Sequence, residues 1–133
     1  MSDPTAQILR NAETLRALKA RVEDTFRARD QSTEKRAAWQ NACAALWSSY
    51  DALAFPGGYD GAPERLQAGD PETVEAALCF LECRPYFFRS GYMFAKILRR
   101  MKHAPLSPPQ QARLDAVVGW LAEWKAKKAA SRR

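Results

Sequence analysis

Residues 72–103 read ETVEAALCFLECRPYFFRSGYMFAKILRRMKH, and this stretch decides the fold. Its first and last thirds carry apolar residues at the i, i+3, i+4, i+7 spacing of an amphipathic helix. The first pattern comprises Val74, Ala77, Leu78 and Leu81, and the second comprises Phe94, Ile97, Leu98 and Met101. Because each apolar stripe must be covered, we predict two helices that pack against other parts of the chain.

The polar faces of these two predicted helices carry opposite charges. One flank of the first helix holds three acidic residues, Glu72, Glu75 and Glu82. The flank of the second helix opposite its apolar stripe holds basic residues at one-turn spacing, Lys96, Arg99, Arg100 and His103. We therefore expect one acidic helix and one basic helix.

A connector, residues 84–92 (RPYFFRSGY), joins the two helices. Pro85 disfavours helical geometry at the residue before it, so the first helix should end near Cys83. Ser90 is predicted to be the N-cap of the second helix, because a serine hydroxyl can accept a hydrogen bond from the first helical turn.

The aromatic residues of the connector exceed what a plain turn needs. We expect Phe87 and Phe88, together with Phe94 of the following helix, to fill the core. The two tyrosines and the arginines of the connector should divide between partner binding and structural roles. In the structural role, the arginines would cap carbonyl groups or pair with the acidic helix.

Two long helices are predicted before this central pair. Asp3-Pro4 has the N-cap and first-turn proline of a helix that continues to about residue 29. A second helix should follow the break at residues 29–32, capped by either Ser32 or Asp30, and end near residues 52–55.

The second helix and the loop after it have further predicted features. Trp39 and Trp47 lie on the apolar stripe of that helix, which places both rings in the core. Residues 56–61 (PGGYDG) predict a turn, since they lack the Lys-Ser/Thr of a phosphate-binding loop. A short helix over residues 62–68 and a new helix start at Asp70-Pro71 should follow.

The last helix begins at Ser107, which forms a capping-box pattern with Gln110. Its apolar stripe comprises Leu114, Val117, Val118, Leu121 and Trp124. No segment shows sustained alternation of apolar and polar residues. We therefore predict one all-α domain over residues 1–133, either a compact bundle or a short solenoid-like stack of about five antiparallel helices.

Charge is distributed unevenly along the chain. The net charge is +6, and residues 84–133 hold 12 basic and only 2 acidic residues, whereas residues 53–83 hold 1 and 6. Such a basic segment attracts polyanions, whether nucleic acid, acidic protein or anionic membrane. The alternative is that the acidic helix neutralises part of this charge and solvent covers the rest. The basic tail, residues 125–133, is expected to fray.

Membrane insertion and export are not expected. The apolar runs are far shorter than a membrane span, and the N-terminal residues lack the charged-then-apolar layout of a signal peptide. We predict a cytoplasmic protein with no membrane partner.

Three cysteines and one histidine are the candidate metal ligands, Cys43, Cys79, Cys83 and His103. Together they would supply a Cys3His zinc set, but the C-x2-C spacing of structural zinc sites is absent. We expect the cysteines to be buried as small hydrophobic residues, without a disulfide, a metal or another cofactor.

Catalytic motifs are also missing. The sequence has no G-x-S-x-G, H-E-x-x-H or dinucleotide-binding pattern, and its one histidine lies beside arginines rather than a carboxylate. A site built on Asp70 with Glu72 or Glu75 stays open, but nothing selects it. We predict that the chain is not an enzyme.

The connector and the basic helix hold the candidate binding residues, Arg84, Tyr86, Arg89, Tyr92, Lys96, Arg99 and Arg100. Arginine and tyrosine are enriched at protein-binding hot spots, and the same residues bind nucleic-acid backbones and stack on bases. The leading hypothesis is therefore a protein-binding module. The alternative is an RNA- or DNA-binding protein that uses residues 84–103, with Lys102 added to the set.

Four short phrases resemble a pattern found in a family of small, uncharacterised bacterial all-helical proteins. They are residues 53–58 (LAFPGG), 80–82 (FLE), 85–92 (PYFFRSGY) and 98–102 (LRRMK). The resemblance covers about residues 39–118 and leaves the first helix and the tail outside it. Such proteins are associated with toxin–immunity gene neighbourhoods.

This resemblance implies a cytoplasmic immunity protein that neutralises a toxin by occluding it, without catalytic residues of its own. One feature departs from that pattern, because immunity proteins that face nucleases are usually acidic and this chain is basic. The partner would then need an acidic surface, or would contact the acidic stretch from Asp60 to Glu82.

Overall fold

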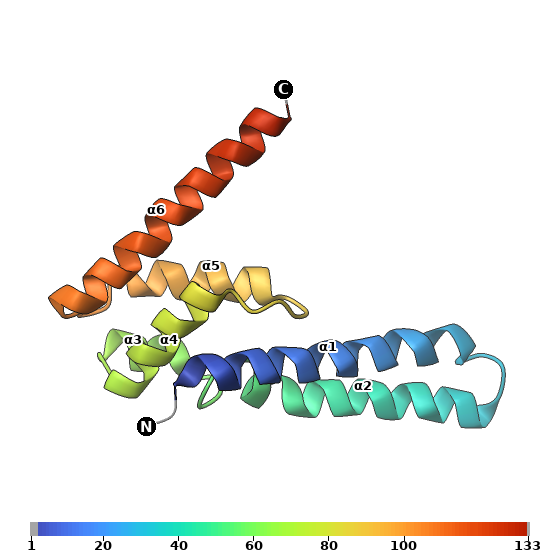
Figure 1. Ribbon diagram of the computed structural model, residues 1–133. Coiled ribbons are helices and arrows are strands. Elements are labelled where there is room, and N and C mark those ends of the chain that lie inside the picture. Colours follow the sequence, from blue (N-terminus) through green and yellow to red (C-terminus); the bar gives the residue numbers. More distant parts are fainter. Residues whose placement is uncertain (1–2, 133) are drawn as a thin grey trace.

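A computed structural model describes residues 3–132, which form six α-helices and no strands (Figure 1). The all-α prediction is confirmed. The helices are α1 (Pro4–Ala28), α2 (Thr33–Ala54), α3 (Ala62–Gln67), α4 (Pro71–Cys83), α5 (Ser90–Met101) and α6 (Pro108–Ser131).

Side-chain caps fix the starts of four helices, as the sequence predicts. The Asp3 carboxylate accepts a hydrogen bond from the Thr5 amide (2.9 Å), and Ser32 accepts one from the third residue of α2 (3.1 Å). Asp70 does the same at α4 (3.0 Å). At α6 the Ser107 hydroxyl and the Gln110 side chain form the complete capping box. These bonds satisfy amide groups that have no partner inside a helix.

The predicted N-cap at Ser90 is wrong. Arg89 is the N-cap of α5, in the left-handed region at φ 68°, and Ser90 is the first helical residue. The Ser90 hydroxyl instead accepts a hydrogen bond from the amide of Phe87 (3.1 Å), so it closes the connector rather than the helix. The predicted end of α4 is correct, since Arg84 leaves the helix at φ 46°.

The helices form a bundle with two arms (Figure 1). α1 and α2 make a long antiparallel hairpin, and its inner end packs on α4. α3, α4 and α5 complete the bundle, where α4 contacts α1, α3, α5 and α6. α6 contacts α4 at its N-terminal half and then leaves the bundle, so α6 and the α1–α2 hairpin form an open V.

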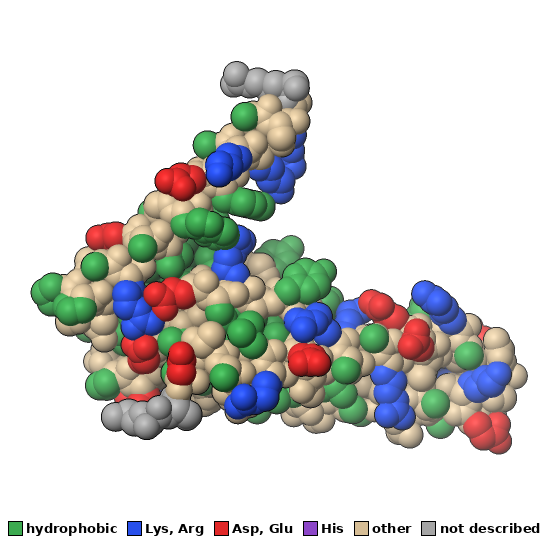
Figure 2. Space-filling model, viewed as in Figure 1, with side chains coloured by type: hydrophobic (Ala, Val, Ile, Leu, Met, Phe, Trp, Pro, Cys, Tyr) green, Lys and Arg blue, Asp and Glu red, His purple; other side chains and the backbone are tan. Residues whose placement is uncertain are grey.

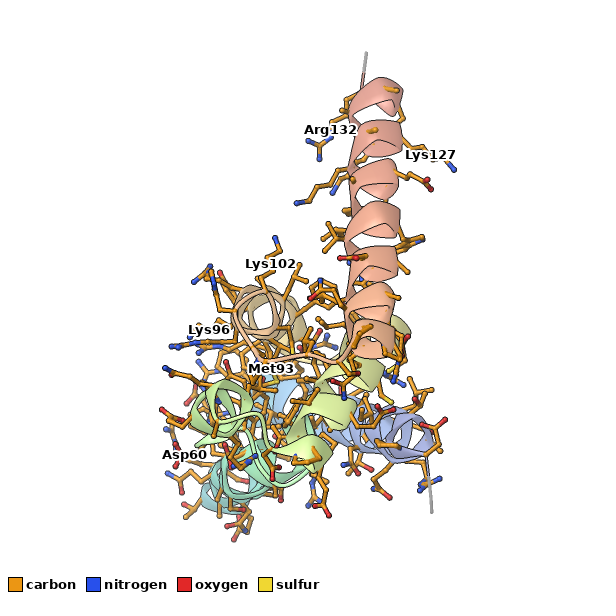
Figure 3. The ribbon with its side chains drawn as sticks, turned by 90° about the vertical axis from the view of Figure 1, so that its left-hand side faces the viewer. Asp60, Met93, Lys96, Lys102, Lys127 and Arg132 are labelled. Atoms are coloured by element: carbon orange, nitrogen blue, oxygen red, sulfur yellow. The ribbon has the colours of Figure 1, made fainter. Side chains whose placement is uncertain are left out.

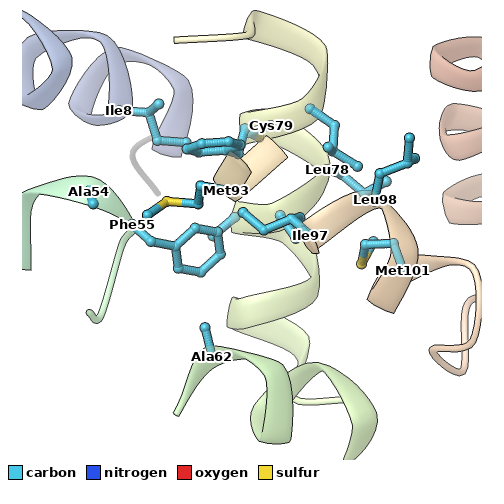
Figure 4. Packing of buried hydrophobic residues seen from close by; sticks show 14 of the residues in the cluster. Ile8, Ala54, Phe55, Ala62, Leu78, Cys79, Met93, Ile97, Leu98 and Met101 are labelled. Atoms are coloured by element: carbon cyan, nitrogen blue, oxygen red, sulfur yellow. The ribbon is translucent and has the colours of Figure 1, made fainter. Parts of the chain in front are cut away.

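α4 is the centre of the core. Eight of its 13 residues are buried, including Phe80, whose side chain is fully inaccessible. The Phe80 ring contacts Phe55 (centroids 5.9 Å apart) and Phe87 (6.3 Å). Figure 4 shows Met93 and Ile97 of α5 near Phe55, and Ile8 of α1 on the side of Cys79; all five residues belong to the buried cluster.

The loop over residues 56–61 is a turn, as predicted. Gly58 has a positive φ of 88°, and a Cβ atom there would lie 2.9 Å from the Asp51 carboxylate. Arg65 spans the loop by donating hydrogen bonds to the Gly58 carbonyl (2.9 Å) and to the Thr73 hydroxyl (3.1 Å). The loop therefore ties the end of α2 to α3 and α4.

Three other predictions differ from the structure: two concern the burial of tryptophans, and one concerns the helical state of the C-terminal tail. Trp47 is 56% exposed and packs at an edge against Phe88 of the connector (centroids 6.2 Å apart), and Trp39 is half-buried against Phe26 of α1 (6.0 Å). On α6, Leu114 and Val117 are buried, but Trp124 is 40% exposed and lies at the edge of the bundle beside Arg84. Residues 125–131, expected to fray, continue α6; Lys and Ala are strong helix formers and no breaker interrupts them.

Replacing Phe80 with alanine tests this account of the core. Because the ring is fully buried between Phe55 and Phe87, Phe80→Ala should lower the free energy of unfolding by about 3–5 kcal/mol. Urea denaturation followed by circular dichroism measures this change. The matched control Leu9→Ala removes a half-exposed side chain of α1 and should cost less than about 1 kcal/mol. Similar losses in the two variants would contradict the assignment of Phe80 to the core centre.

Candidate binding surface

The connector is fixed to the bundle through one buried aromatic ring. Phe87 is 4% exposed, and its ring lies against Phe80 on one side and Tyr50 of α2 on the other (6.1 Å). The Tyr50 hydroxyl donates a hydrogen bond to the Phe88 carbonyl at 2.5 Å. Burial raises the pKa of this hydroxyl, so Tyr50 stays protonated and able to donate at neutral pH.

A second anchor comes from α1. Arg16 donates a hydrogen bond through Nη1 to the Tyr86 carbonyl at 2.6 Å, across 70 residues of sequence. Together with the Ser90–Phe87 hydrogen bond, these contacts hold the backbone of residues 86–90 on both sides. The surface side chains of the connector therefore project from a supported backbone rather than from a free loop.

Two tyrosines project from this backbone into solvent. Tyr86 is 77% exposed and Tyr92, in the first turn of α5, is 75% exposed. Between them lies Phe88, which is half-buried and has two cations near its ring: Lys19 Nζ at 4.9 Å and the Arg89 guanidinium at 5.3 Å from the ring centroid. Figure 2 shows hydrophobic and basic side chains next to each other where the connector passes over α1.

The basic face of α5 is exposed, as the sequence predicts. Lys96, Arg99 and Arg100 all face solvent, and Figure 3 shows Lys96 and Lys102 on the outer side of the helix. Among the ion pairs formed by residues 3–132, none involves these side chains or Arg89. Their charge is compensated by solvent rather than by the acidic helix.

The acidic residues of α4 have a different partner, which the sequence did not reveal. Arg113 of α6 binds Glu75 at 2.7 Å and Glu82 at 2.6 Å. These two carboxylates raise the pKa of the Arg113 guanidinium above its usual value. Glu75 and Glu82 therefore neutralise part of the charge of residues 84–133, as the alternative expected, but they do so at Arg113 of α6 and not at the connector arginines.

Arg84 is separated from the other candidate residues. Its guanidinium lies over the rings of Phe94, Trp120 and Trp124, at 5.0, 4.6 and 5.4 Å from their centroids. These cation–π contacts join the C-terminus of α4 to α5 and α6. Arg84 therefore has a structural role at the base of the α6 arm.

Four of the remaining candidate residues, Tyr86, Arg89, Tyr92 and Lys96, border two adjoining hollows. One, of about 770 Å³, lies between α1 and the connector and includes Arg16, Tyr86 and Phe88. The other, of about 460 Å³, lies over Tyr50, Tyr59 and Lys96. Arg89 and Tyr92 line both hollows. Arg99 instead lines a third hollow of about 350 Å³, beside Arg84 and Trp124.

Sequence reasoning missed the contribution of α1 to this surface. Arg16 and Lys19 lie at ordinary solvent-facing positions of a helix whose charges are mixed, so no local pattern distinguishes them. Only their contacts with the connector, 70 residues away, show that they belong to it.

The structure shows where the possible metal ligands and the three cysteines lie. Within residues 3–132, no three His, Cys, Asp or Glu side chains come together in a way that could hold a metal ion. The three cysteines are unpaired; Cys79 is buried, and Cys43 and Cys83 are half-buried.

None of the described helices has the length and apolar character needed to cross a membrane.

Comparison of the chain with protein-family models, curated proteins and solved structures found no match to any of them. The resemblance described above therefore stays a prediction.

Alkylation of the cysteines tests their predicted inertness. Burial raises the pKa of Cys83 to about 11, and it also raises that of Cys79. Since only the thiolate reacts, Cys83 should react with iodoacetamide at neutral pH on the order of a hundredfold more slowly than an unperturbed thiol. The rate should increase as the pH rises toward 11. Mass spectrometry of labelled peptides measures the alkylation rate of each cysteine, and the urea-unfolded chain is the control. Rapid labelling of native Cys83 at pH 7 would contradict this account.

Removal of the Tyr50 hydroxyl tests the anchoring of the connector. Tyr50→Phe leaves the ring contacts but removes the donor to the Phe88 carbonyl, which should cost about 1 kcal/mol of stability. Amide hydrogen exchange at Phe87 and Ser90 should become faster, because both amides bond within the connector. The control Tyr59→Phe removes a hydroxyl that bonds no connector atom. Equal exchange rates in both variants would show that this hydrogen bond does not hold the connector.

Proposed function

We propose that this chain is a non-enzymatic protein-binding module whose partner presents an acidic surface. The proposed binding surface, called here the connector face, comprises Tyr86, Arg89, Tyr92, Lys96, Arg99 and Arg100. One observation carries the proposal. Tyr86 and Tyr92 are each about three-quarters exposed, they lie beside cations that have no acidic partner, and the connector backbone that carries them is hydrogen-bonded to α1 and α2.

Physical reasons connect this arrangement to protein binding. Tyrosine offers a large, rigid contact area and loses little conformational entropy when it is ordered. The anchored backbone reduces the ordering cost further, since the connector does not have to fold on binding. The cations at Arg89 and Lys96 would guide an acidic partner to the surface and fix its orientation.

A finer proposal concerns the kind of partner. The resemblance of residues 39–118 to bacterial immunity-like proteins supports a toxin as the partner, neutralised by occlusion. Because the connector face is basic, the contacted part of that toxin should be acidic rather than a nucleic-acid-binding cleft lined with cations.

Nucleic-acid binding is the alternative function. It is favoured by the row of cations on the outer side of α5, where Lys96, Arg99 and Arg100 recur about once per turn. The dependence of binding affinity on salt concentration distinguishes the two functions. Contacts with phosphates release counterions, so affinity for nucleic acid falls steeply with salt, whereas an interface anchored by buried aromatic rings is less sensitive.

The test is an affinity pull-down from lysate of the source organism, with and without nuclease, followed by mass spectrometry. A single protein retained in stoichiometric amount in both samples supports the proposal. Nucleic acid that disappears with nuclease, in the absence of such a protein, supports the alternative.

Charge reversal locates the binding surface. Arg99→Glu with Arg100→Glu should weaken capture of the partner by at least about tenfold, equivalent to about 1.4 kcal/mol. The matched control is Lys127→Glu with Lys128→Glu, which changes the net charge equally on the α6 arm, at exposed positions away from the connector. Surface plasmon resonance with the captured protein measures both. Equal weakening in both variants would indicate a general charge effect and would contradict the assignment to the connector face.

A further inference from the structure

We propose that the groove between α1 and the connector binds an extended acidic segment of the partner, with carboxylates at Arg16 and Arg89 and an apolar side chain on Phe88. This inference rests on the proposed function and adds to it the place, the shape and the chemistry of the occupant. The groove is the hollow of about 770 Å³ described above, called here the α1–connector groove.

The shape of the groove suits a narrow occupant. α1 forms one wall through Arg16, Lys19 and Glu23, and Tyr86 and Tyr92 stand at the connector side. Gly91 lies in the groove, and a Cβ atom built there meets nothing within 4 Å, so the space above it is open. An extended segment could lie along this hollow, between α1 and the two tyrosines.

The charges of the groove favour carboxylates. Arg16 uses Nη1 to bind the Tyr86 carbonyl, which orients its guanidinium and leaves its other N–H groups available to a ligand. Arg89 is exposed and forms no ion pair with a described residue. Lys19 is paired with Glu23 at 3.1 Å, so the two arginines supply most of the available positive charge. Bidentate binding of carboxylates is a property of the guanidinium group.

The same groove is poorly suited to a nucleic-acid backbone. Glu23 on the groove wall neutralises Lys19, which leaves Arg16 and Arg89 as the cations available to a ligand. Only two cations are free of acidic partners, which is too few for the run of phosphate contacts that gives nucleic-acid proteins their affinity. One or two carboxylates with an apolar side chain between them would match the number of free arginines and the ring of Phe88.

The second hollow indicates where the segment continues. It shares Arg89 and Tyr92 with the α1–connector groove and extends to Lys96 on α5. A segment that leaves the groove past Tyr92 would meet Lys96 next, so a further acidic residue should follow the two bound by the arginines.

A pair of glycines allows the groove to be filled without altering the fold. Gly91→Trp places an indole in open space inside the groove, and Gly119→Trp places one in open space on α6. Both glycines are helical without a positive φ, so neither variant introduces backbone strain. Circular dichroism melting curves should show that both variants are at least as stable as the original chain.

The binding experiment uses short random peptides displayed on phage, selected on the immobilised full chain. Selected peptides are then measured by fluorescence polarisation against the original chain, Gly91→Trp and Gly119→Trp. We expect the selected peptides to contain at least two acidic residues around an apolar one. Gly91→Trp, or replacement of the peptide carboxylates by amides, should weaken binding by at least about tenfold, and Gly119→Trp should leave it unchanged.

Three results would overturn the inference. The first is a selection that fails or that yields peptides without acidic residues. The second is equal binding of the peptides to Gly91→Trp and to the original chain. The third is displacement of the peptides by single-stranded oligothymidine, which would indicate that nucleic acid binds in the groove. The captured partner separates this inference from the proposed function. If charge reversal at Arg99 and Arg100 abolishes capture while Gly91→Trp does not, the binding module stands and the groove assignment fails.

Discussion

The insertion of Phe87 into the core is the contact on which the rest of the surface depends. Its ring lies between Phe80 of α4 and Tyr50 of α2, and so joins the connector to the two parts of the chain before it. The backbone turns on either side of this ring, at Arg84 and Arg89, which are the two non-glycine residues with positive φ among the described residues. Such conformations cost of order 1 kcal/mol or more and persist only where surrounding contacts hold them. Burial of Phe87 supplies that constraint, and its neighbours Tyr86 and Phe88 then point outward.

The distribution of ion pairs decides which charges stay available to a partner. Arg113 binds both Glu75 and Glu82 and so uses two carboxylates of α4 to attach α6 to the bundle. The cations of α5 lie on another side of the molecule and have no such carboxylate within reach. The exposed cations of α5 are thus left without an ion-pair partner among the described residues, whereas Arg113 of α6 is neutralised. This separation is what gives the connector face its proposed preference for an acidic partner.

The α1–connector groove combines groups that are far apart in the sequence. Arg16 comes from the first helix, whereas Tyr86, Phe88 and Arg89 come from the connector, and one hydrogen bond from Arg16 to the Tyr86 carbonyl joins the two. The same side chain therefore supports the backbone and lines the groove. Because such a surface is formed before the partner arrives, little ordering is needed on binding, and its specificity follows from the spacing of its charges and rings.

The sequence by itself determined the helices and their limits, because those depend on local chemistry. The 3.6-residue period set the buried faces of α4 and α5, and Asp3, Asp70 and Ser107 fixed helix starts through bonds within one turn. Periodicity also placed the exposed cations of α5 correctly. Only the tertiary structure decided which apolar faces are covered: Trp47 and Trp124 lie on apolar stripes, yet both are exposed because they pack at the edges of the bundle, against Phe88 and Arg84. The tertiary structure also decided that Ser90 accepts a hydrogen bond from Phe87 and is not the N-cap of α5. It likewise decided that Arg113 pairs with Glu75 and Glu82, and that Arg16 lies beside the connector. These depend on contacts between distant residues, which a local pattern does not encode.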